Sequence, residues 1–580
     1  MVFTTPEWVP KLPFDPPDSI TIAEFVNNET YGRYPVAKAR NPFTCGFTGK
    51  TYSMSEVLQR EEFMARAIAK RLGYDLSKGT EWDRVVCLFS LNTVDYIPFT
   101  HAIHRLSSIV TPASAAYSAP ELEHQLQSSG ANALFTCVPL LKTALAAAKA
   151  AGIPEERIFI LPMSGDKQVP FQTIDDLVLE GETLPELPPL VFTPGQGARQ
   201  VAYLCYSSGT SGLPKATMIS HHNVISNIMM VRLYNQVGRT TAKVETQATL
   251  GLLPFSHVYG LVVCGLYALV AGDELVVLPR FELKTFLEVI QKFRIEQIAI
   301  VPPVLIQMLN NQDLCSGYDL SSVRFVLSGA APLGLETMQD ILKVYPNWHL
   351  CQGYGLTETS PVVTFTSELD ILPGSSGSLL PGLRAKIIDA TGKEVTGYET
   401  PGEMLVQGPT VVLGYLNNIN STASTFIYDE DGRWMKTGDE VIVRKSPKGT
   451  EHFIVTDRIK ELIKVKGHQV APAELEAHLL SHPLVSDCAV IQVPNAKAGE
   501  VPKAFVVKAA EAGGMLPMYA DGDVTASIHK HVEDHKARHK WLKGGIEFIN
   551  VIPKSPTGKI LRRLLRDQEK QARKAKGPKL

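Results

Sequence analysis

The sequence has little excess charge, few cysteines and no long apolar run. Its 580 residues include 57 basic and 59 acidic side chains, which gives a formal net charge of −2. A chain with this balance lacks the basic field that attracts nucleic acid, so nucleic acid is not an expected partner. The eight cysteines are scattered and form no Cys-x-x-Cys pair, which favours free thiols in a reducing compartment over a zinc or disulfide framework.

Targeting and membrane segments are also missing. The N-terminal stretch MVFTTPEWVPKLPFDPP has neither a basic start nor an apolar core, so it does not resemble a signal peptide. The longest apolar stretch runs from Gly260 to Ala271 and is too short to cross a bilayer. We therefore expect a soluble, cytoplasmic or otherwise intracellular protein with no transmembrane segment.

What the sequence does contain is the composition of an ordinary globular protein, with 44% hydrophobic and 20% charged residues. Its length predicts two to four domains or subdomains. From about residue 84 to 301, β-prone runs such as VVCLFSL and QIAIVPP alternate with helix-like stretches, which is typical of an α/β fold. After Pro373, short strands separated by turns predict a β-rich subdomain, and the residues after Asp457 predict a compact α+β domain.

The stretch YSSGTSGLPKAT, residues 206–217, combines small hydroxyl residues, glycines and Lys215 after a buried β-prone run. Such a loop can turn tightly and direct several N–H groups and a positive charge at one anion. Most Gly/Ser/Thr clusters are solvated turns, but the hydroxyls and the lysine favour a phosphate site. Because the lysine is preceded by Leu-Pro and followed by alanine, the loop is not a Walker A motif, which disfavours a P-loop kinase or ATPase.

Two further loops place glycines where a predicted strand ends, which is where open α/β sheets bind ligands. They are SGAAPLG, from Ser328, and QGYGLTET, from Gln352. In the second loop Tyr354 offers a ring for stacking, while Thr357 and Glu358 suit a phosphate and its Mg²⁺ ion. Taken alone, Glu358 is more simply a helix-start acid. In TGDE, Asp439 could hold a ribose diol, although that motif is weak by itself.

Five stretches in this order carry a specific resemblance: SSGTSGLPK, GYGLTET, KTGD, TDRIKELIKVKGHQVAPAELE and PKSPTGKILRR. The chain resembles the adenylate-forming (AMP-binding) superfamily over residues 20–570, and within it the 4-coumarate:CoA ligase-like acyl-CoA synthetases. The resemblance implies a large N-terminal domain, residues 1–457, with two α/β subdomains and a β-rich one. A hinge at 458–460, centred on Lys460, and a small mobile α+β domain at 461–580 would follow.

The resemblance implies a reaction of ATP, Mg²⁺, CoA and a small carboxylic acid, through an acyl-AMP, to an acyl-CoA thioester. Lys559 would bridge the acid and the α-phosphate, and Glu358 would hold Mg²⁺ beside Thr357. Asp439 and Arg458 would hold the ribose. The remaining ATP/AMP-binding residues would be Ser207, Ser208, Gly209, Thr210, Ser211, Gly212, Lys215, Gly329, Ala330, Ala331, Gln352, Gly353, Tyr354 and Gly355.

By the same resemblance His257 stands at the entrance of the acyl site, while Lys464 and Gln469 face the adenylate. Lys466 and Gly467 would lie along the CoA path, near His468, which stands where an aromatic residue is common. The acyl pocket would comprise Ser256, His257, Val258, Tyr259, Ser328, Gly329, Pro361 and Val362. It is mostly apolar, which leaves aryl, arylpropenoic and medium-chain fatty acids open as substrates.

Other functions in the same superfamily remain as alternatives. An amino-acid adenylation domain needs a carboxylate that pairs with the substrate amine, and LLPFSHVYGLVV has none. A luciferase-like enzyme shares the adenylation step and is not excluded by the motifs. A non-catalytic nucleotide-binding scaffold should have lost Lys559 or Glu358, and this chain retains both.

Two features of the C-terminal region lie outside these motifs. His531, His535 and His539 have the spacing of one helix face, but the lysines between them favour a solvated helix over a metal site. The last residues, Pro578-Lys579-Leu580, are similar to the Ser-Lys-Leu type of peroxisomal address. They predict a peroxisomal import receptor as a partner and residence in the peroxisome, with a solvated tail on a cytosolic enzyme as the close alternative.

Overall fold

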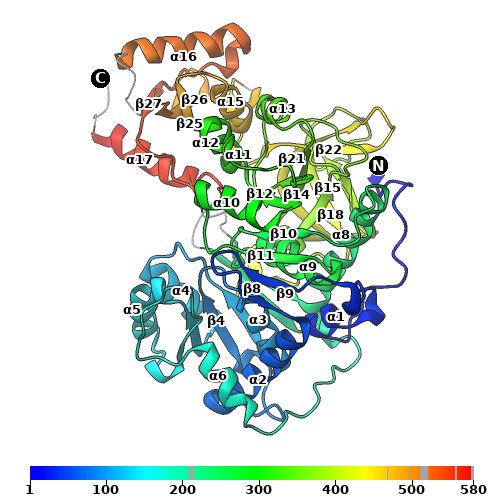
Figure 1. The fold of residues 1–580 in the computed structure, drawn as a ribbon. Helices are drawn as coiled ribbons and strands as arrows, with labels where there is room; N and C mark the ends of the chain where they lie inside the picture. Colours follow the sequence, from blue (N-terminus) through cyan, green and yellow to red (C-terminus); the bar gives the residue numbers. More distant parts are fainter. Residues whose placement is uncertain (208–213, 467, 496, 510–519, 556–557, 576–580) are drawn as a thin grey trace.

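Four β-sheets organise the described part of the chain (Figure 1). The computed structural model describes all residues except 208–213, 467, 496, 510–519, 556–557 and 576–580. No helix among the described residues is long and apolar enough to cross a membrane.

A seven-stranded sheet forms the first α/β subdomain. Its strands, in spatial order, are β19 (Gly414–Tyr415), β9 (Lys215–Ser220), β8 (Val201–Ser207), β5 (Ile109–Pro112), β4 (Val85–Phe89), β6 (Ala133–Thr136) and β7 (Ile158–Ile160). Alternate residues of β4 face opposite layers, as the period of a strand requires. Val86 and Leu88 join the large central core, whereas Cys87 and Phe89 pack with a smaller cluster under helices α4 (Ala119–Ser129) and α5 (Leu141–Ala151).

Helix α2 (Met54–Leu72) shows how the sequence sets the limits of an element. The Ser53 side chain accepts a hydrogen bond from Glu56 N, and the Glu56 side chain accepts one from Ser53 N. This capping box satisfies N–H groups that the first turn leaves open. The helix ends at Gly73, whose φ of 68° is a left-handed conformation that glycine adopts at little cost.

A nine-stranded sheet forms the second α/β subdomain. Its order is β16 (Ser378–Leu379), β15 (Val362–Phe365), β14 (His349–Gly355), β13 (Phe325–Ser328), β12 (Gln297–Ile300), β10 (Ala248–Gly251), β11 (Glu274–Val277), β2 (Phe43–Cys45) and β3 (Thr51–Tyr52). The six strands from β14 to β2 are parallel, so their C-terminal ends share one edge. Two of the segments that sequence analysis assigned to ATP begin in the last residues of β13 and β14, at that edge.

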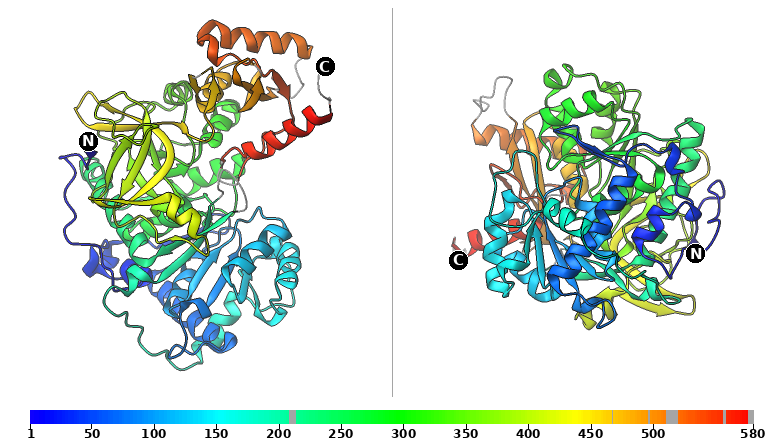
Figure 2. Two further views of the ribbon diagram at one scale, coloured as in Figure 1. Left: turned by 180° about the vertical axis from the view of Figure 1, so that it is seen from behind. Right: turned by 60° about the horizontal axis from the view of Figure 1, so that its bottom comes forward.

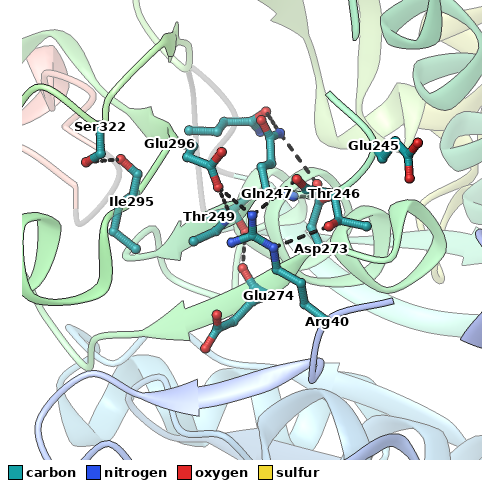
Figure 3. A network of polar contacts seen from close by, with 12 residues as sticks. Arg40, Glu245, Thr246, Gln247, Thr249, Asp273, Glu274, Ile295, Glu296 and Ser322 are labelled. Carbon is teal, nitrogen blue, oxygen red and sulfur yellow. Dashed lines mark hydrogen bonds and ion pairs between the residues drawn. The ribbon is translucent and has the colours of Figure 1, made fainter. Parts of the chain in front are cut away.

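A polar network covers the opposite, N-terminal ends of β10, β11 and β12 (Figure 3). Arg40 pairs with Glu296 at 2.9 Å, and Glu296 accepts a hydrogen bond of 2.8 Å from Ala248 N. Asp273, which is 1% exposed, accepts hydrogen bonds of 2.7 Å from Arg239 Nη1 and Nη2. Because these charged side chains pair with one another, we assign this edge of the sheet a structural role. The ligand loops lie at the opposite edge.

The predicted β-rich subdomain is a six-stranded antiparallel sheet. Its strands are β1 (Val2–Phe3), β17 (Arg384–Ile388), β18 (Gly402–Gln407), β21 (Gly432–Lys445), β20 (Phe426–Asp429) and β22 (Glu451–Arg458). The N-terminal strand β1 is an edge strand of this sheet, because Val2 pairs with Lys386 of β17, far along the chain. Strands β21 and β22 bring Asp439 opposite Arg458.

The C-terminal region folds as a small α+β unit with a core of its own, including Leu475, Leu479, Val506 and Ile528. Its sheet contains β24 (His468–Val470), β23 (Ile463–Val465), β26 (Gly499–Lys508), β25 (Val485–Asn495) and β27 (Ile546–Phe548). Its helices are α15 (Pro472–Leu480), α16 (Asp521–His535) and α17 (Arg562–Ala575). Figure 2 shows it resting on the second subdomain.

The architecture confirms the predicted α/β fold with a large N-terminal part and a smaller C-terminal part. The domain limits at 457 and 461 stay a prediction, although β22 ends at Arg458 and β23 begins at Ile463, on either side of the expected hinge.

Candidate active site

The predicted phosphate loop joins two antiparallel strands. Ser207, at the end of β8, pairs with Lys215, at the start of β9. Ser208, Gly209, Thr210, Ser211 and Gly212 lie outside the described residues. The Lys215 ammonium lies 5.2 Å from the centre of the Tyr415 ring, close enough for a cation–π contact. The hairpin therefore holds the lysine at the base of the loop.

Glu358 lies in the single turn η7 (Thr357–Thr359), directly after β14, and is 8% exposed. Its Oε1 accepts hydrogen bonds of 2.9 Å from the Ser207 hydroxyl and from the Tyr415 hydroxyl. Two donors on one oxygen fix the carboxylate, and among the described residues none donates a hydrogen bond to Oε2. Sequence analysis did not predict a role for Tyr415, because nothing in the surrounding stretch VVLGYLNN indicates a binding site.

Tyr354, Asp439 and Arg458 meet where β14, β21 and β22 approach one another. The Tyr354 hydroxyl donates to Asp439 Oδ2 at 2.8 Å, and Arg458 Nε lies 3.5 Å from Asp439 Oδ1. Burial raises the pKa of Asp439, while Arg458 and the Tyr354 hydrogen bond oppose that rise. This trio combines an aromatic ring, a carboxylate and a guanidinium within one contact network.

The two glycine-bearing loops are packed too closely for larger residues. A Cβ on Gly355 would lie 2.0 Å from the Pro361 carbonyl oxygen, and one on Gly329 would lie 2.8 Å from the Tyr259 ring. Between them, the Gln352 side chain accepts a hydrogen bond of 3.1 Å from Leu333 N. Gly353, Ala330 and Ala331 lie on the same two segments, so the predicted adenine-flanking residues are neighbours.

Lys559 belongs to the C-terminal unit but lies among charges of the N-terminal part. Burial, followed by the positive charge of Arg458, lowers the pKa of Lys559 to about 8, while Asp439, Glu461 and Glu358 act in the opposite direction. A Cβ on the preceding Gly558 would lie 3.2 Å from Val301 Cγ2, at the start of helix α11 (Pro302–Leu309). The Lys559 turn is therefore docked against the second subdomain, beside Asp439 and Glu358.

His257 shares this electrostatic environment. Burial lowers the pKa of His257 to about 4, and the positive charge of Lys559 contributes to that decrease. Its Nδ1 accepts a hydrogen bond of 3.2 Å from Tyr259 N, and the Tyr259 hydroxyl donates to Leu327 O at 3.0 Å. The other predicted acyl-pocket residues follow the same segments: Ser256, Val258, Ser328, Gly329, Pro361 and Val362.

Lys464 and Gln469, predicted to face the adenylate, and Lys466, predicted along the CoA path, do not join this group in the described structure. Lys464 and Gln469 pair across the hairpin of β23 and β24, and both are exposed. Lys466 is exposed on the same hairpin, and Gly467 lies outside the described residues. Lys460 is exposed in the turn after β22. The structure thus brings Lys559 to the site and leaves the hairpin that carries Lys464 in solvent.

Comparison with known proteins agrees with this architecture. The family model "AMP-binding enzyme" matches residues 31–416, and the model "AMP-binding enzyme C-terminal domain" matches residues 474–559. The acyl-CoA ligase AKT1 of Alternaria alternata is 40% identical over 98% of this chain and 97% of its own length. The acyl-CoA ligase easD of Emericella nidulans is 37% identical over 98% of this chain and 100% of its own.

Solved structures share the fold. The anthranilate CoA ligase AuaEII in complex with anthranoyl-AMP has a TM-score of 0.79 at 23% identity, covering 95% of this chain and 98% of that one. ATP-bound MatB from Rhodopseudomonas palustris has a TM-score of 0.75 at 23% identity, covering 95% and 99%. These matches confirm the family resemblance and the predicted enzyme class, the AMP-forming acyl-CoA synthetases. The chain belongs to the AMP-binding enzyme family and stands among its acyl-CoA ligases.

Proposed function

We propose that the protein joins a carboxylic acid to CoA in two steps, through an acyl-AMP. The observation that carries this proposal is the position of Lys559, docked from the C-terminal unit beside Asp439, Arg458 and Glu358. A cation at this point serves a reaction in which two anions, a carboxylate and a triphosphate, must approach each other.

In the first step a carboxylate oxygen of the acid attacks the α-phosphorus of ATP, and the bond to pyrophosphate breaks. Lys559 would stabilise the charge that shifts toward pyrophosphate. Lys215 and the loop 207–212 would hold the outer phosphates, Tyr354 would stack on adenine, and Asp439 with Arg458 would hold the ribose. The contact network of these last three residues supports this assignment.

The residues around Glu358 fit a Mg²⁺ ion. The ion usually takes one or two carboxylates together with substrate phosphates, and in the described part of the chain both hydrogen bonds to Glu358 go to its Oε1. When bound, Mg²⁺ would neutralise phosphate charge. The chain contributes the orientation of that carboxylate, through the hydroxyls of Ser207 and Tyr415.

In the second step the CoA thiol gives its proton to water, its sulfur attacks the acyl carbon, and the bond from that carbon to the AMP oxygen breaks to release AMP. We propose that the C-terminal unit rotates about Lys460 between the steps. The rotation would withdraw Lys559 and bring in the hairpin that carries the exposed Lys464, Lys466 and Gln469, together with Gly467, which lies outside the described residues. Lys464, Lys466 and Gln469 are exposed in the docked arrangement, which supports such an exchange.

We further propose an apolar acid as the substrate, from the aryl, arylpropenoic or medium-chain fatty acids. The Tyr259 ring lies 2.8 Å from the Gly329 Cβ position, and Tyr259 and its neighbour Val258 both belong to the apolar central core. His257, with a pKa of about 4, is neutral at physiological pH and adds no charge that would select a polar tail. Apolar pockets discriminate by only about 10–200-fold per methylene group, so several acids should react.

The test is an acid panel with the purified protein, ATP, Mg²⁺ and CoA. We expect AMP and an acyl-CoA thioester in equal amounts, and only with an accepted acid. Formation of ADP would contradict the proposal. Acyl-AMP without any thioester would instead favour the alternative of an adenylating enzyme that lacks CoA transfer, and a preference for free amino acids would favour an adenylation domain.

Peroxisomal residence is a separate proposal, based on Pro578-Lys579-Leu580, which lie outside the described residues. A fluorescent protein that ends in the last ten residues should colocalise with a peroxisomal marker, and deleting Leu580 should disperse it. A diffuse signal from both fusions would place the enzyme in the cytosol.

A further inference from the structure

Helices α15 and α16 of the C-terminal unit bring together histidines that are far apart in the sequence. Sequence analysis expected His531, His535 and His539 to share one solvated face. The structure separates them: the His539 ring stacks on His468 at 4.5 Å, whereas His531 and His535 face His478 of α15. We call this group the histidine triad: His478, His531 and His535.

The triad rings are in mutual contact. The ring centres of His478 and His531 lie 4.2 Å apart. The ring centre of His535 lies 5.4 Å from that of His478 and 5.3 Å from that of His531. One ring nitrogen from each of the three residues lies within 4.8 Å of the other two. His531 and His535 are four residues apart on one helix, and the buried His478 supplies the third ring from the neighbouring helix.

Backbone carbonyls set the tautomers of the triad. His478 Nε2 donates to His531 O, His531 Nε2 donates to His478 O, and His535 Nδ1 donates to His531 O, at 2.9–3.1 Å. In a neutral imidazole the other nitrogen then carries a lone pair, which is how protein histidines are oriented for a metal. Among the described residues, the second nitrogen of each triad ring accepts no hydrogen bond.

The nearby His482 is not available as a ligand, because both of its nitrogens are used. Its Nδ1 accepts from Leu484 N at 3.2 Å, and its Nε2 contacts the Ser527 hydroxyl at 3.0 Å. The positive charges next to the triad are compensated as well. Lys536 and Lys540 both pair with Glu474 of α15, at 3.2 and 2.6 Å.

We propose that the histidine triad binds one divalent transition-metal ion of the zinc class. Imidazole nitrogens suit Zn²⁺, Cu²⁺ and Ni²⁺. Bond lengths of about 2.0–2.1 Å bring two ligand nitrogens to roughly 3.3 Å. The His478 and His531 rings stack at an interplanar angle of 6°, so one of them turns out of the stack when both bind the ion. His535 is exposed, so water fills the remaining position on that side.

The ion would join α16 to α15 and stabilise the C-terminal unit. Helix α15 also carries Ala477, whose Cβ lies 3.0 Å from the Cβ position of Gly334 in the N-terminal part. The site therefore adjoins the docking surface between the two parts. This inference does not depend on the proposed reaction.

The test uses the full-length protein, stripped with a chelator and kept in excess Mg²⁺ so that the Glu358 region does not take up the probe. Co²⁺ is added and its visible absorption is recorded, and Zn²⁺ then competes for the site. We expect one Zn²⁺ per chain and a rise in melting temperature. His535→Gln, at the exposed position, should weaken binding at least about tenfold, since even the loss of an outer-shell partner costs ~10–100-fold.

His529→Gln is the matched control, because His529 lies on the same helix outside the triad. Its binding should equal that of the unchanged protein. His531→Ala provides a second loss-of-ligand variant, with its fold checked by circular dichroism. Absence of Zn²⁺ binding, or equal affinity in the His535→Gln and His529→Gln variants, would overturn the proposal.

Discussion

Lys559 carries the most specific chemical expectation at the scale of single residues. Replacing it by alanine removes the cation beside Asp439 and Glu358. We expect acid-dependent exchange of pyrophosphate into ATP to fall by about 10²–10³-fold, as for other positioned electrostatic contacts. Thioester formation from a supplied acyl-AMP should stay near the original rate, because this lysine is withdrawn in the second step.

The two half-reactions of the Lys559→Ala variant are measured separately. Lys554→Ala is a suitable control, since Lys554 lies on the same segment and pairs with Asp487 at 2.7 Å, away from the site. Equal loss in both half-reactions would contradict an exchange of residues between the steps.

The pH dependence of adenylation follows from the same side chain. Burial and Arg458 lower the pKa of Lys559 to about 8, and only the protonated form carries the required charge. The value of kcat/KM for the acid should therefore be highest below this pKa and should fall as the pH rises through about 8, because kcat/KM reports the free enzyme. A falling limb that persists unchanged in Lys559→Ala would assign it to another group.

Gly558 tests the Lys559 turn at the scale of an element. Its φ of 77° is left-handed, and a Cβ would lie 3.2 Å from Val301 Cγ2. Gly558→Ala should impair docking of the turn and slow adenylation by about tenfold, a loss of ~1.4 kcal/mol, with little change in thioester formation. Separate half-reaction rates measure this.

Gly545→Ala controls for backbone strain, since Gly545 has a φ of 90° and no atom within 4 Å of its Cβ position. It should lower stability without a selective loss of adenylation. The same selective loss in both variants would remove the docking contact from the explanation.

The strand-ending loops were the predictable part of the site, because glycines and hydroxyls after a β-prone run have a local signature. The contacts between loops had no such signature. Tyr415 reaches Glu358 across 57 residues of sequence, and Tyr354 reaches Asp439 across 85. These pairs depend on how the sheets pack. Likewise, the spacing of His531 and His535 was visible, but their contact with His478 required the packing of two helices.

At the scale of the whole molecule, the arrangement of the two parts should decide which step can occur. Cysteines at Gly334 and Ala477 would have Cβ atoms about 3.0 Å apart, close to the 3.5–4.5 Å of a disulfide. The oxidised double variant should adenylate the acid but fail to form thioester, and a reductant should restore the second step. The Ala477→Cys single variant is the control. Full thioester formation in the oxidised protein would show that no rotation is needed.

The most direct measurement of the central claim follows the oxygen atoms of the acid. An accepted acid labelled with ¹⁸O in both carboxylate oxygens is incubated with the protein, ATP, Mg²⁺ and CoA. The masses of the products are then measured by mass spectrometry. Passage through an acyl-AMP predicts that one labelled oxygen appears in AMP and none in pyrophosphate. Unlabelled AMP, or label in ADP or inorganic phosphate, would contradict the account.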